Sequence, residues 1–359
     1  MAVHFHPLVI KSIRKETPEC VSLCFDVPQE LEPVFKFKEG QNLTLKKNIN
    51  GEEIRRSYSI CAAPHEQELR VAIKKVPGGS FSGFANEELK AGDTLEVLPP
   101  SGKFTSKISS EPAAKYLAVA AGSGITPIIA IIKHTLQTQP ESTFTLLYGN
   151  QNRQSIIFFE ELESLKNKFI GRFQFINVLS RESLDAELLY GRIDDEKLKA
   201  FEKIIDYAKM DAVYLCGPEA MIFTVRNFLE SKGLDQSKIH FELFHVPGQA
   251  SSVSGKKETS ISDDQPRSKI ELTLDGRTIH FELAAKGLSI LDAALQQGAD
   301  LPYACKGGVC CSCRAKVTNG SVQMDVNYAL EPEEVEAGYI LTCQSHPTSE
   351  NVVVNFDLK

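Results

Sequence analysis

The sequence has no run of about 18 or more apolar residues, so we expect no membrane-spanning helix. It also lacks an excess of positive charge. The formal net charge of −7 over 359 residues does not favour nucleic acid or an anionic membrane as a partner. Residues 1–28 lack the basic start and the apolar run of a signal peptide. Together these absences predict a cytoplasmic protein without a nucleic-acid partner.

The even set of cysteines that is typical of a secreted disulfide framework is also missing. There are nine cysteines, and five of them lie between residues 305 and 343. The length predicts two or three domains, at roughly 100–200 residues each. Changes of pattern place the expected domains at 1–110, 111–245 and 269–359, with a linker at 246–268.

Residues 1–110 are expected to form an antiparallel β-barrel. Strand-like runs separated by Gly, Pro and Asn turn signals occur at 21–27, 41–45, 69–76 and 94–98. In the first run apolar and polar residues alternate, which predicts a half-buried strand.

Residues 111–245 change to strand–helix alternation, which predicts an α/β domain with helices on both faces of a parallel sheet. The expected strands are 116–121, 143–148, 173–179, 212–216 and 239–244. The expected helices lie near 126–137, 156–168, 195–208 and 218–231.

Residues 246–268 are rich in Ser, Gly, Lys and Asp, which predicts a flexible linker. Residues 269–359 begin with a β-hairpin whose two-residue turn is Asp275-Gly276. A short helix follows, with Ser289 as its N-cap and Gly298 just past its end.

Four cysteines have the spacing C-x4-C-x2-C with a distant fourth member: Cys305, Cys310, Cys313 and Cys343. Plant-type [2Fe–2S] ferredoxins use this spacing. Structural zinc, which also takes four cysteines, is the alternative. Cys311 is interpreted as a bystander between ligands. The flanking residues 301–304 and 341–344 resemble the plant-type ferredoxin family, which implies an α+β β-grasp domain.

The segment Arg56-Ser57-Tyr58-Ser59 resembles the R-x-Y-S motif of the ferredoxin–NADP reductase superfamily. The resemblance implies that Arg56 pairs with a flavin phosphate, Tyr58 stacks on the isoalloxazine ring and Ser59 bonds near N5. An ordinary strand with a salt bridge is the alternative.

A second flavin element lies at Gly79-Ser80-Phe81-Ser82, ahead of a helix expected over 83–89. Backbone N–H groups at a helix start bind anions. Gly79 and Ser82 match the G-x-x-S pattern with which this superfamily binds a flavin pyrophosphate, which favours FAD over FMN.

A nucleotide loop is expected at G-x-G-I-T-P, where Gly122, Gly124, Thr126 and Pro127 follow a strand and open a helix. Pro127 replaces the third glycine of the Rossmann pattern and suits a first helical turn. A plain turn is the alternative, but the superfamily uses this same motif for its nucleotide.

Cys216-Gly217-Pro218 begins a C-G-P-x-x-M pattern that also resembles this superfamily. The resemblance implies a small wall for the nicotinamide ring, with an ordinary core cysteine as the alternative. An acid–aromatic pair that caps the flavin is implied after the last strand, with Glu242 and Phe244 as candidates, although Phe244 equally suits the core.

Arg153, Ser180 and Arg181 follow the second and third strands of the α/β domain, where an NAD site offers a carboxylate. Ser and Arg suit a 2′-phosphate instead, so NADPH is expected over NADH. Solvated surface arginines are the alternative.

The domain order resembles the oxygenase reductases that end in a ferredoxin domain, including the reductase components of di-iron phenylacetyl-CoA epoxidases. That resemblance implies hydride transfer from NADPH to FAD and single-electron transfer through the cluster to an oxygenase. Residues 269–359 hold 7 Lys/Arg and 12 Asp/Glu, a net charge of −5, which suits docking to a basic acceptor surface or simple solubility. The alternatives are another acceptor (a desaturase-type or Rieske enzyme), a stand-alone NADPH oxidase or dye reductase, and a non-enzymatic scaffold.

Overall fold

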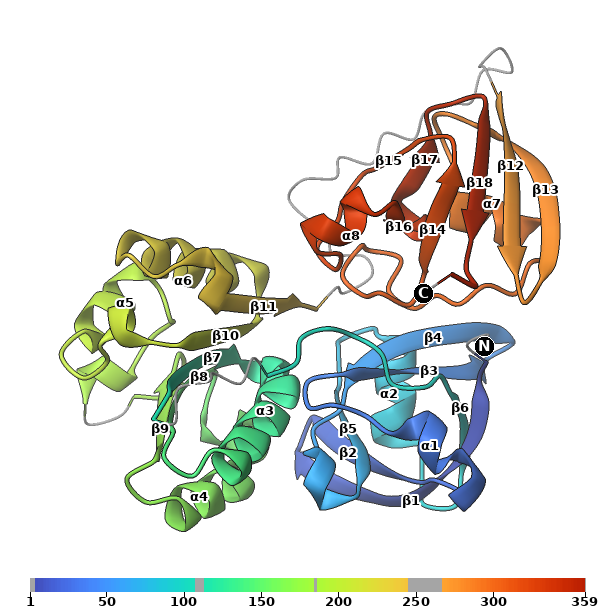
Figure 1. The fold of residues 1–359 in the computed structure, drawn as a ribbon. Helices are drawn as coiled ribbons and strands as arrows, with labels where there is room; N and C mark the ends of the chain where they lie inside the picture. The colour runs from blue at the N-terminus through green and yellow to red at the C-terminus, as the bar shows by residue number, and fades with distance from the viewer. Residues whose placement is uncertain (1–3, 107–112, 184–185, 245–266, 359) are drawn as a thin grey trace. The chain divides into compact units, whose positions relative to one another are not determined.

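The computed structural model describes residues 4–106, 113–183, 186–244 and 267–358 (Figure 1). These residues fall into two compact units. One holds nearly all of residues 7–244, and the other includes residues 267–358. The expected linker falls outside the described residues up to position 266, and β12 begins at Arg267.

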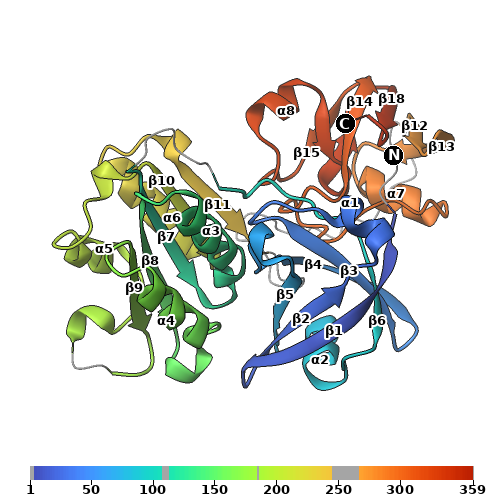
Figure 2. The same ribbon diagram turned by 60° about the horizontal axis from the view of Figure 1, so that its bottom comes forward.

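Six strands form the barrel of the first unit, in the order β4-β3-β6-β1-β2-β5 (Figure 2). A bridge between Ile60, just after β4, and Val71 of β5 joins the two edges of this sheet. The elements are β1 (His6–Thr17), β2 (Cys20–Asp26), α1 (Glu32–Phe35), β3 (Asn42–Ile49), β4 (Glu52–Ser59), β5 (Leu69–Lys74), α2 (Ser80–Glu87) and β6 (Thr94–Val97). The expected antiparallel β-barrel is confirmed.

The expectation that the first run is a half-buried strand is wrong, because all residues of β2 except the last are buried. One face of β2 contributes Val21, Leu23 and Phe25 to the barrel core. Cys20 belongs instead to the hydrophobic core of the α/β domain. The barrel therefore shares a buried boundary with the α/β domain.

The α/β domain has a five-stranded parallel sheet in the order β11-β10-β7-β8-β9. Its strands are β7 (Lys115–Ala121), β8 (Thr143–Asn150), β9 (Phe173–Leu179), β10 (Ala212–Gly217) and β11 (Ile239–Leu243). Helices α3 (Ile125–Thr138) and α4 (Phe159–Lys168) cover one face, and α5 (Asp195–Phe201) and α6 (Glu219–Ser231) lie over the other (Figure 1).

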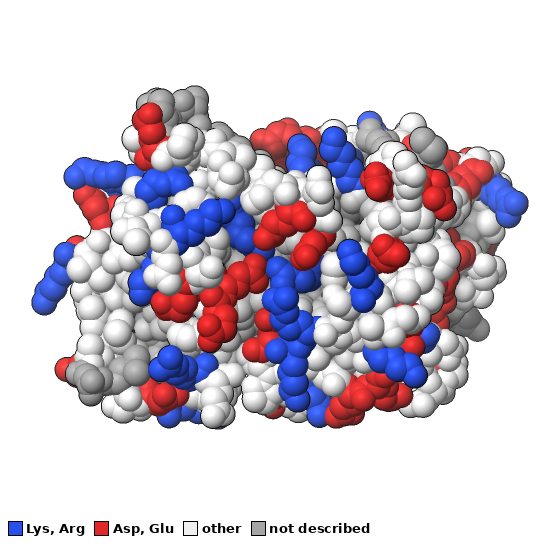
Figure 3. All heavy atoms as spheres, turned by 90° about the horizontal axis from the view of Figure 1, so that it is seen from below, with Lys and Arg blue, Asp and Glu red and all other residues white. Residues whose placement is uncertain are grey.

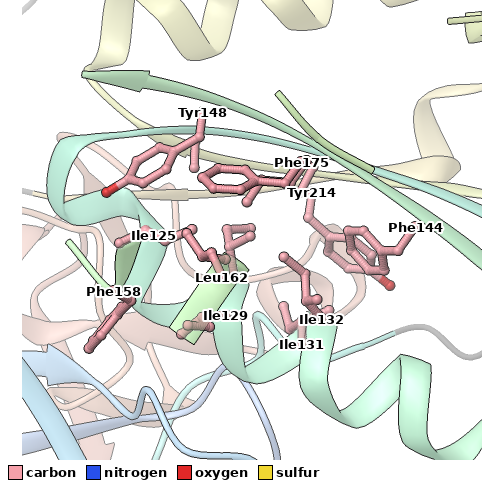
Figure 4. Packing of buried hydrophobic residues seen from close by; sticks show 14 of the residues in the cluster. Ile125, Ile129, Ile131, Ile132, Phe144, Tyr148, Phe158, Leu162, Phe175 and Tyr214 are labelled. Atoms are coloured by element: carbon pink, nitrogen blue, oxygen red, sulfur yellow. The ribbon is translucent and has the colours of Figure 1, made fainter. Parts of the chain in front are cut away.

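The core of this domain packs α3 and α4 against the sheet. Figure 4 shows Ile125, Ile129 and Leu162 beneath the rings of Tyr148 and Phe175. Two expected helices differ from the structure. The one expected near 195–208 ends at Phe201, where the chain turns so that Ile205 and Tyr207 are buried. The one expected near 156–168 begins only at Phe159.

The second unit contains a mixed five-stranded sheet, β13-β12-β18-β14-β16, and the two-stranded pair β15-β17. The hairpin turn is confirmed, with positive φ at both Asp275 and Gly276. Ser289 caps α7 by accepting from the Asp292 N–H, and Gly298 has a φ of +81°. The elements are β12 (Arg267–Leu274), β13 (Arg277–Ala284), α7 (Ile290–Gln296), β14 (Arg314–Asn319), β15 (Val322–Met324), α8 (Pro332–Glu336), β16 (Tyr339–Leu341), β17 (Ser345–Pro347) and β18 (Asn351–Asn355).

Basic and acidic side chains lie side by side on the face seen in Figure 3. None of the described helices has both the length and the apolar character needed to cross a membrane.

Candidate flavin, nucleotide and cluster sites

The R-x-Y-S segment forms the end of β4. Arg56 and Ser57 are half-buried, and the Arg56 guanidinium donates to the Arg55 carbonyl at 2.8 Å. The half-buried Tyr58 ring lies 5.7 Å from the ring of Phe81, at an interplanar angle of 36°. Phe81 belongs to α2, so the two expected flavin elements touch each other through these rings.

The expected pyrophosphate loop precedes α2, which begins at Ser80 rather than at residue 83. Gly79 is the N-cap, and a Cβ there would lie 2.6 Å from the Ser82 Oγ, so a larger residue would displace the Ser82 hydroxyl. The Ser82 hydroxyl accepts from the Val76 N–H and donates to the Gly79 carbonyl, which holds it inside the loop. The N-cap residue Gly79 has no side chain to cap the first turn of α2, so the amides of this turn suit a phosphate.

The nucleotide loop forms a 3-10 turn, Gly122–Gly124, directly before α3. Gly122 has a φ of +53°, and its carbonyl accepts from the Tyr148 hydroxyl at 2.8 Å. The Thr126 hydroxyl donates to the Ser123 carbonyl, and Pro127 is buried in the first helical turn. A Cβ on Gly124 would lie 2.1 Å from the carbonyl oxygen of Cys216, so only glycine fits there.

Lys74, at the end of β5, was not identified from the sequence. Its Nζ lies 3.6 Å from the position that a Cβ on Gly122 would occupy. A barrel cation therefore faces the loop expected to hold the nucleotide pyrophosphate. The sequence places a lysine at the end of a predicted strand, but only the fold shows that this lysine lies near the Gly122 loop.

The ends of β4, β10 and β11 bring Ser59, Cys216 and Glu242 together. The Ser59 hydroxyl donates to the Glu242 carboxyl group at 3.2 Å. Cys216 and Glu242 are register partners in the parallel pair β10–β11. Phe244 follows β11 and is 38% exposed, so it is available at this edge rather than in the core.

Burial governs the protonation of Glu242 and Cys216. Desolvation raises the pKa of Glu242 to about 7, although the bond from Ser59 opposes the shift. Burial and then the neighbouring Glu242 raise the pKa of Cys216 well above its usual value, so its thiol stays neutral. The Cys216 thiol is therefore neutral, and the Glu242 carboxyl group titrates near neutral pH. Together they can accept hydrogen bonds and hold a proton without placing a permanent charge at this edge of the sheet.

The residues expected to contact a 2′-phosphate lie together at the ends of β8 and β9. Backbone bonds join Ser180 to Asn150 and Arg181 to Gln151. Arg181 and Arg153 are exposed, and the Arg153 guanidinium lies 5.0 Å from the centre of the Phe159 ring. A carboxylate is also present, since Glu182 accepts from the Arg153 N–H at 2.7 Å.

The four expected cluster ligands meet through their sulfur atoms. The sulfurs of Cys305 and Cys310 are 3.1 Å apart, and further thiol contacts join Cys305 to Cys343 and Cys343 to Cys313. No three described His, Cys, Asp or Glu side chains surround one point closely enough to hold a single metal ion. A [2Fe–2S] cluster takes two thiolates at each of two irons, and these four cysteines supply that number.

The backbone around these thiols also suits a cluster. The Gly307 N–H points at the Cys305 sulfur at 3.3 Å, and the Gln344 amide lies 3.7 Å from the Cys343 sulfur. Gly308 has a φ of +73°, and a Cβ there would lie 2.9 Å from the Val326 carbonyl. The Cys311 thiol donates to the Ala329 carbonyl at 3.3 Å.

Three family models match successive parts of this chain. The oxidoreductase FAD-binding domain matches residues 7–106, and the oxidoreductase NAD-binding domain matches residues 118–227. The 2Fe-2S iron-sulfur cluster binding domain matches residues 272–348. The chain is therefore an oxidoreductase with FAD-binding, NAD-binding and 2Fe-2S cluster binding domains.

Among curated proteins, the chain is 46% identical to a subunit of the 1,2-phenylacetyl-CoA epoxidase of Escherichia coli (strain K12), over 99% of this chain and 98% of that protein. It is 33% identical to the ferredoxin reductase component of 3-ketosteroid-9-alpha-monooxygenase of Rhodococcus rhodochrous, over 97% of this chain and 96% of that protein. Among solved structures, phthalate dioxygenase reductase matches with a TM-score of 0.58 and 25% identity, covering 98% of both chains.

Proposed function

This chain belongs to the family of FAD-, NAD- and 2Fe-2S-domain oxidoreductases that includes the matched polypeptide of 1,2-phenylacetyl-CoA epoxidase, and on that premise we propose that it is the reductase component of an oxygenase. A phenylacetyl-CoA epoxidase is the first candidate partner, because the identity to that relative is 46%, against 33% for the 3-ketosteroid monooxygenase component. The hydrogen bond from Ser59 to Glu242 carries the proposal, since it joins the flavin-motif strand to the edge that bears the C-G-P motif.

FAD, when bound, would accept a hydride and release electrons singly to the cluster. The protein's own work is to bind and orient. Arg56, Ser57, Tyr58 and Ser59 would hold the flavin ring and a phosphate, while the loop at Gly79, Ser80 and Ser82 would present amides to the pyrophosphate. Ser82 would act by shaping this loop, because its hydroxyl is already bonded within it.

The nucleotide would lie across the loop of Gly122, Gly124, Thr126 and Pro127, with Lys74 near its pyrophosphate. Cys216, Gly217 and Pro218 would form the wall beside the nicotinamide ring. Phe244 would cover the flavin from the end of β11, which its exposure permits. Cys305, Cys310, Cys313 and Cys343 would ligate the [2Fe–2S] cluster.

A preference for NADPH is the finer proposal. Ser180 and the exposed Arg181 directly follow β9, at the edge of the sheet where open α/β sheets bind the adenosine ribose of a nucleotide. Arg153 follows β8, the neighbouring strand, by three residues. The Glu182 carboxylate, which would favour NADH, is already engaged by the Arg153 N–H. Replacing Arg181 with Ala should lower kcat/KM for NADPH about 10-fold and leave that for NADH nearly unchanged. An unchanged NADPH/NADH ratio would refute the preference.

Oxygenase docking would use the 269–359 domain, whose net charge of −5 contrasts with −2 for the rest of the chain. The domain division at 1–110, 111–245, 246–268 and 269–359 and a cytoplasmic location remain part of the proposal.

The direct test is an anaerobic titration of the purified protein with NADPH, followed by the visible spectrum. Bleaching of both flavin and iron–sulfur bands would support the path, and bleaching of the flavin alone would contradict it. Adding a purified phenylacetyl-CoA epoxidase oxygenase component should raise the rate of NADPH consumption several-fold. A rate that does not respond to the oxygenase would favour a stand-alone oxidase or another acceptor.

A further inference from the structure

Four charged side chains, two buried cations and two partly exposed carboxylates, form an ion network between the barrel and the α/β domain, which lie in one compact unit. The Lys133 ammonium group of α3 bonds to Glu66 of the barrel at 2.7 Å and to Glu161 of α4 at 2.6 Å. The Arg70 guanidinium of β5 bonds to both oxygens of Glu161, at 3.1 and 3.3 Å. Two cations and two carboxylates thus alternate across the domain boundary.

The two cations of this network are almost inaccessible to solvent. The Lys133 side chain is 4% exposed and that of Arg70 is 9% exposed. Buried ion pairs contribute little net stability over a well-packed apolar contact, because desolvation offsets their attraction. They do restrict how the two domains pack, because each charged hydrogen bond forms only when its partners are correctly placed. A network of this kind therefore specifies geometry more than it adds stability.

Backbone strain accompanies the network. Phe158 is the N-cap of α4 and has a φ of +61°, a conformation that bulky residues rarely adopt. Its ring is buried in the α/β core (Figure 4), and the Arg70 guanidinium lies 5.7 Å from the ring centre. The left-handed turn starts α4 so that Glu161, three residues later, faces both cations. Such strain persists only where the surrounding structure enforces it, and it is concentrated at functional sites.

Helix α3 is held to the barrel at a second place as well. His134 lies 3.7 Å from the buried Glu39, which also accepts from the Ser106 N–H at 3.2 Å. A Cβ on Gly40 would lie 3.3 Å from Ile131 of α3, so the barrel backbone comes close to this helix. The first turn of the same helix follows directly on Gly124. The helix that carries the nucleotide loop is therefore anchored to the flavin barrel.

We propose that Lys133 is a positioning residue for hydride transfer: through Glu66 and Glu161 it sets the placement of α3, and so of the nucleotide loop, against the flavin barrel. This inference rests on the proposed function, because it assumes that the barrel binds the flavin and the loop binds the nucleotide. A displacement of about 1 Å at a reacting centre can lower a rate about 100-fold. Loss of the network should therefore act on the hydride-transfer rate more than on nucleotide affinity.

The test uses the full-length holoprotein with the double replacement Lys133→Met and Glu66→Gln. One cation and one carboxylate are removed together, so the Arg70–Glu161 pair remains balanced. The matched control is Lys166→Met with Glu163→Gln, the same changes at an exposed pair on α4. The measurement is the rate of flavin bleaching at saturating nucleotide in anaerobic stopped flow, together with the nucleotide Kd. Flavin content and the unfolding midpoint report separately on folding.

We expect the double variant to bleach at least 10-fold more slowly at saturation, with a Kd within about threefold of the parent value. The control should match the parent in both quantities. If the double variant does not fold, Glu66→Gln alone, which removes the ionic bond to Lys133 at nearly unchanged side-chain size, should still slow bleaching more than about twofold. A folded variant that bleaches within twofold of the parent rate would overturn the inference. If neither nucleotide bleaches the flavin of the parent protein, the proposed function itself fails.

Discussion

Replacing Gly124 with Ala tests how closely the nucleotide loop must approach the end of β10. The added Cβ would lie 2.1 Å from the carbonyl oxygen of Cys216, 2.4 Å from its carbonyl carbon and 2.9 Å from the Gly217 nitrogen. All three are backbone atoms inside a paired strand, so no side chain can rotate away to relieve the overlap. Either the 3-10 turn Gly122–Gly124 or the end of β10 must move.

The size of the effect follows from that overlap. Relief of a 2.1 Å contact needs a shift on the order of 1 Å, because carbon and oxygen atoms that are not bonded pack at about 3.5 Å. Overpacking of this kind costs about 1–3 kcal/mol of stability, and a shift of about 1 Å at the nucleotide costs up to about 100-fold in rate. Gly83 gives a matched contrast, since a Cβ there meets nothing within 4 Å. Gly83→Ala in helix α2 should stabilise the protein by about 0.5–1 kcal/mol.

The assay combines thermal unfolding with anaerobic flavin bleaching by NADPH. Gly124→Ala should unfold at a lower temperature and bleach about 10- to 100-fold more slowly, while reduction by dithionite still bleaches both cofactors. Normal dithionite bleaching would show that the flavin and the cluster are intact. A Gly124→Ala variant with parent-like stability and bleaching rate would refute the close-packing argument and the placement of the nucleotide at this loop.

Two further predictions concern Glu242 at the end of β11 and Lys74 at the end of β5. Because the pKa of Glu242 is raised from 4.5 to about 7, its ionisation in the folded state opposes folding. The free energy of unfolding should therefore fall by about 1–3 kcal/mol as the pH rises from about 5 to about 8, and Glu242→Gln should lose that slope in urea titrations. An unchanged slope would place the titrating group elsewhere. Lys74→Met should raise the NADPH Kd about 10-fold at unchanged FAD content, and an unchanged Kd would remove Lys74 from the nucleotide site.

Features that depend on local chain chemistry were predictable from the sequence. The hairpin turn at Asp275-Gly276 needs positive φ at both residues, and few residue pairs supply it. The strand at Phe173–Leu179 was predicted to the residue, because its apolar run is bounded by turn residues. The spacing of Cys305, Cys310 and Cys313 predicted three thiols on one loop, and the structure brings them together with the distant Cys343. In each case the signal lies within a few residues of the feature.

Features that depend on contacts between distant segments were not predictable in the same way. β2 has the alternation of a half-buried strand, yet both of its faces are buried, and at the start of the strand Cys20 packs into the core of the α/β domain. Lys133 falls within an otherwise apolar stretch of α3, and Glu66 lies 67 residues away in a barrel loop. In the sequence this lysine only interrupts the apolar pattern of the helix. In the structure it is buried beside two carboxylates, which pair with it and suit the proposed positioning of α3. A charged residue inside an apolar helical face is thus a useful signal, since burying it unpaired would cost more than a domain can tolerate. Its partner becomes known only when the fold places a carboxylate beside it.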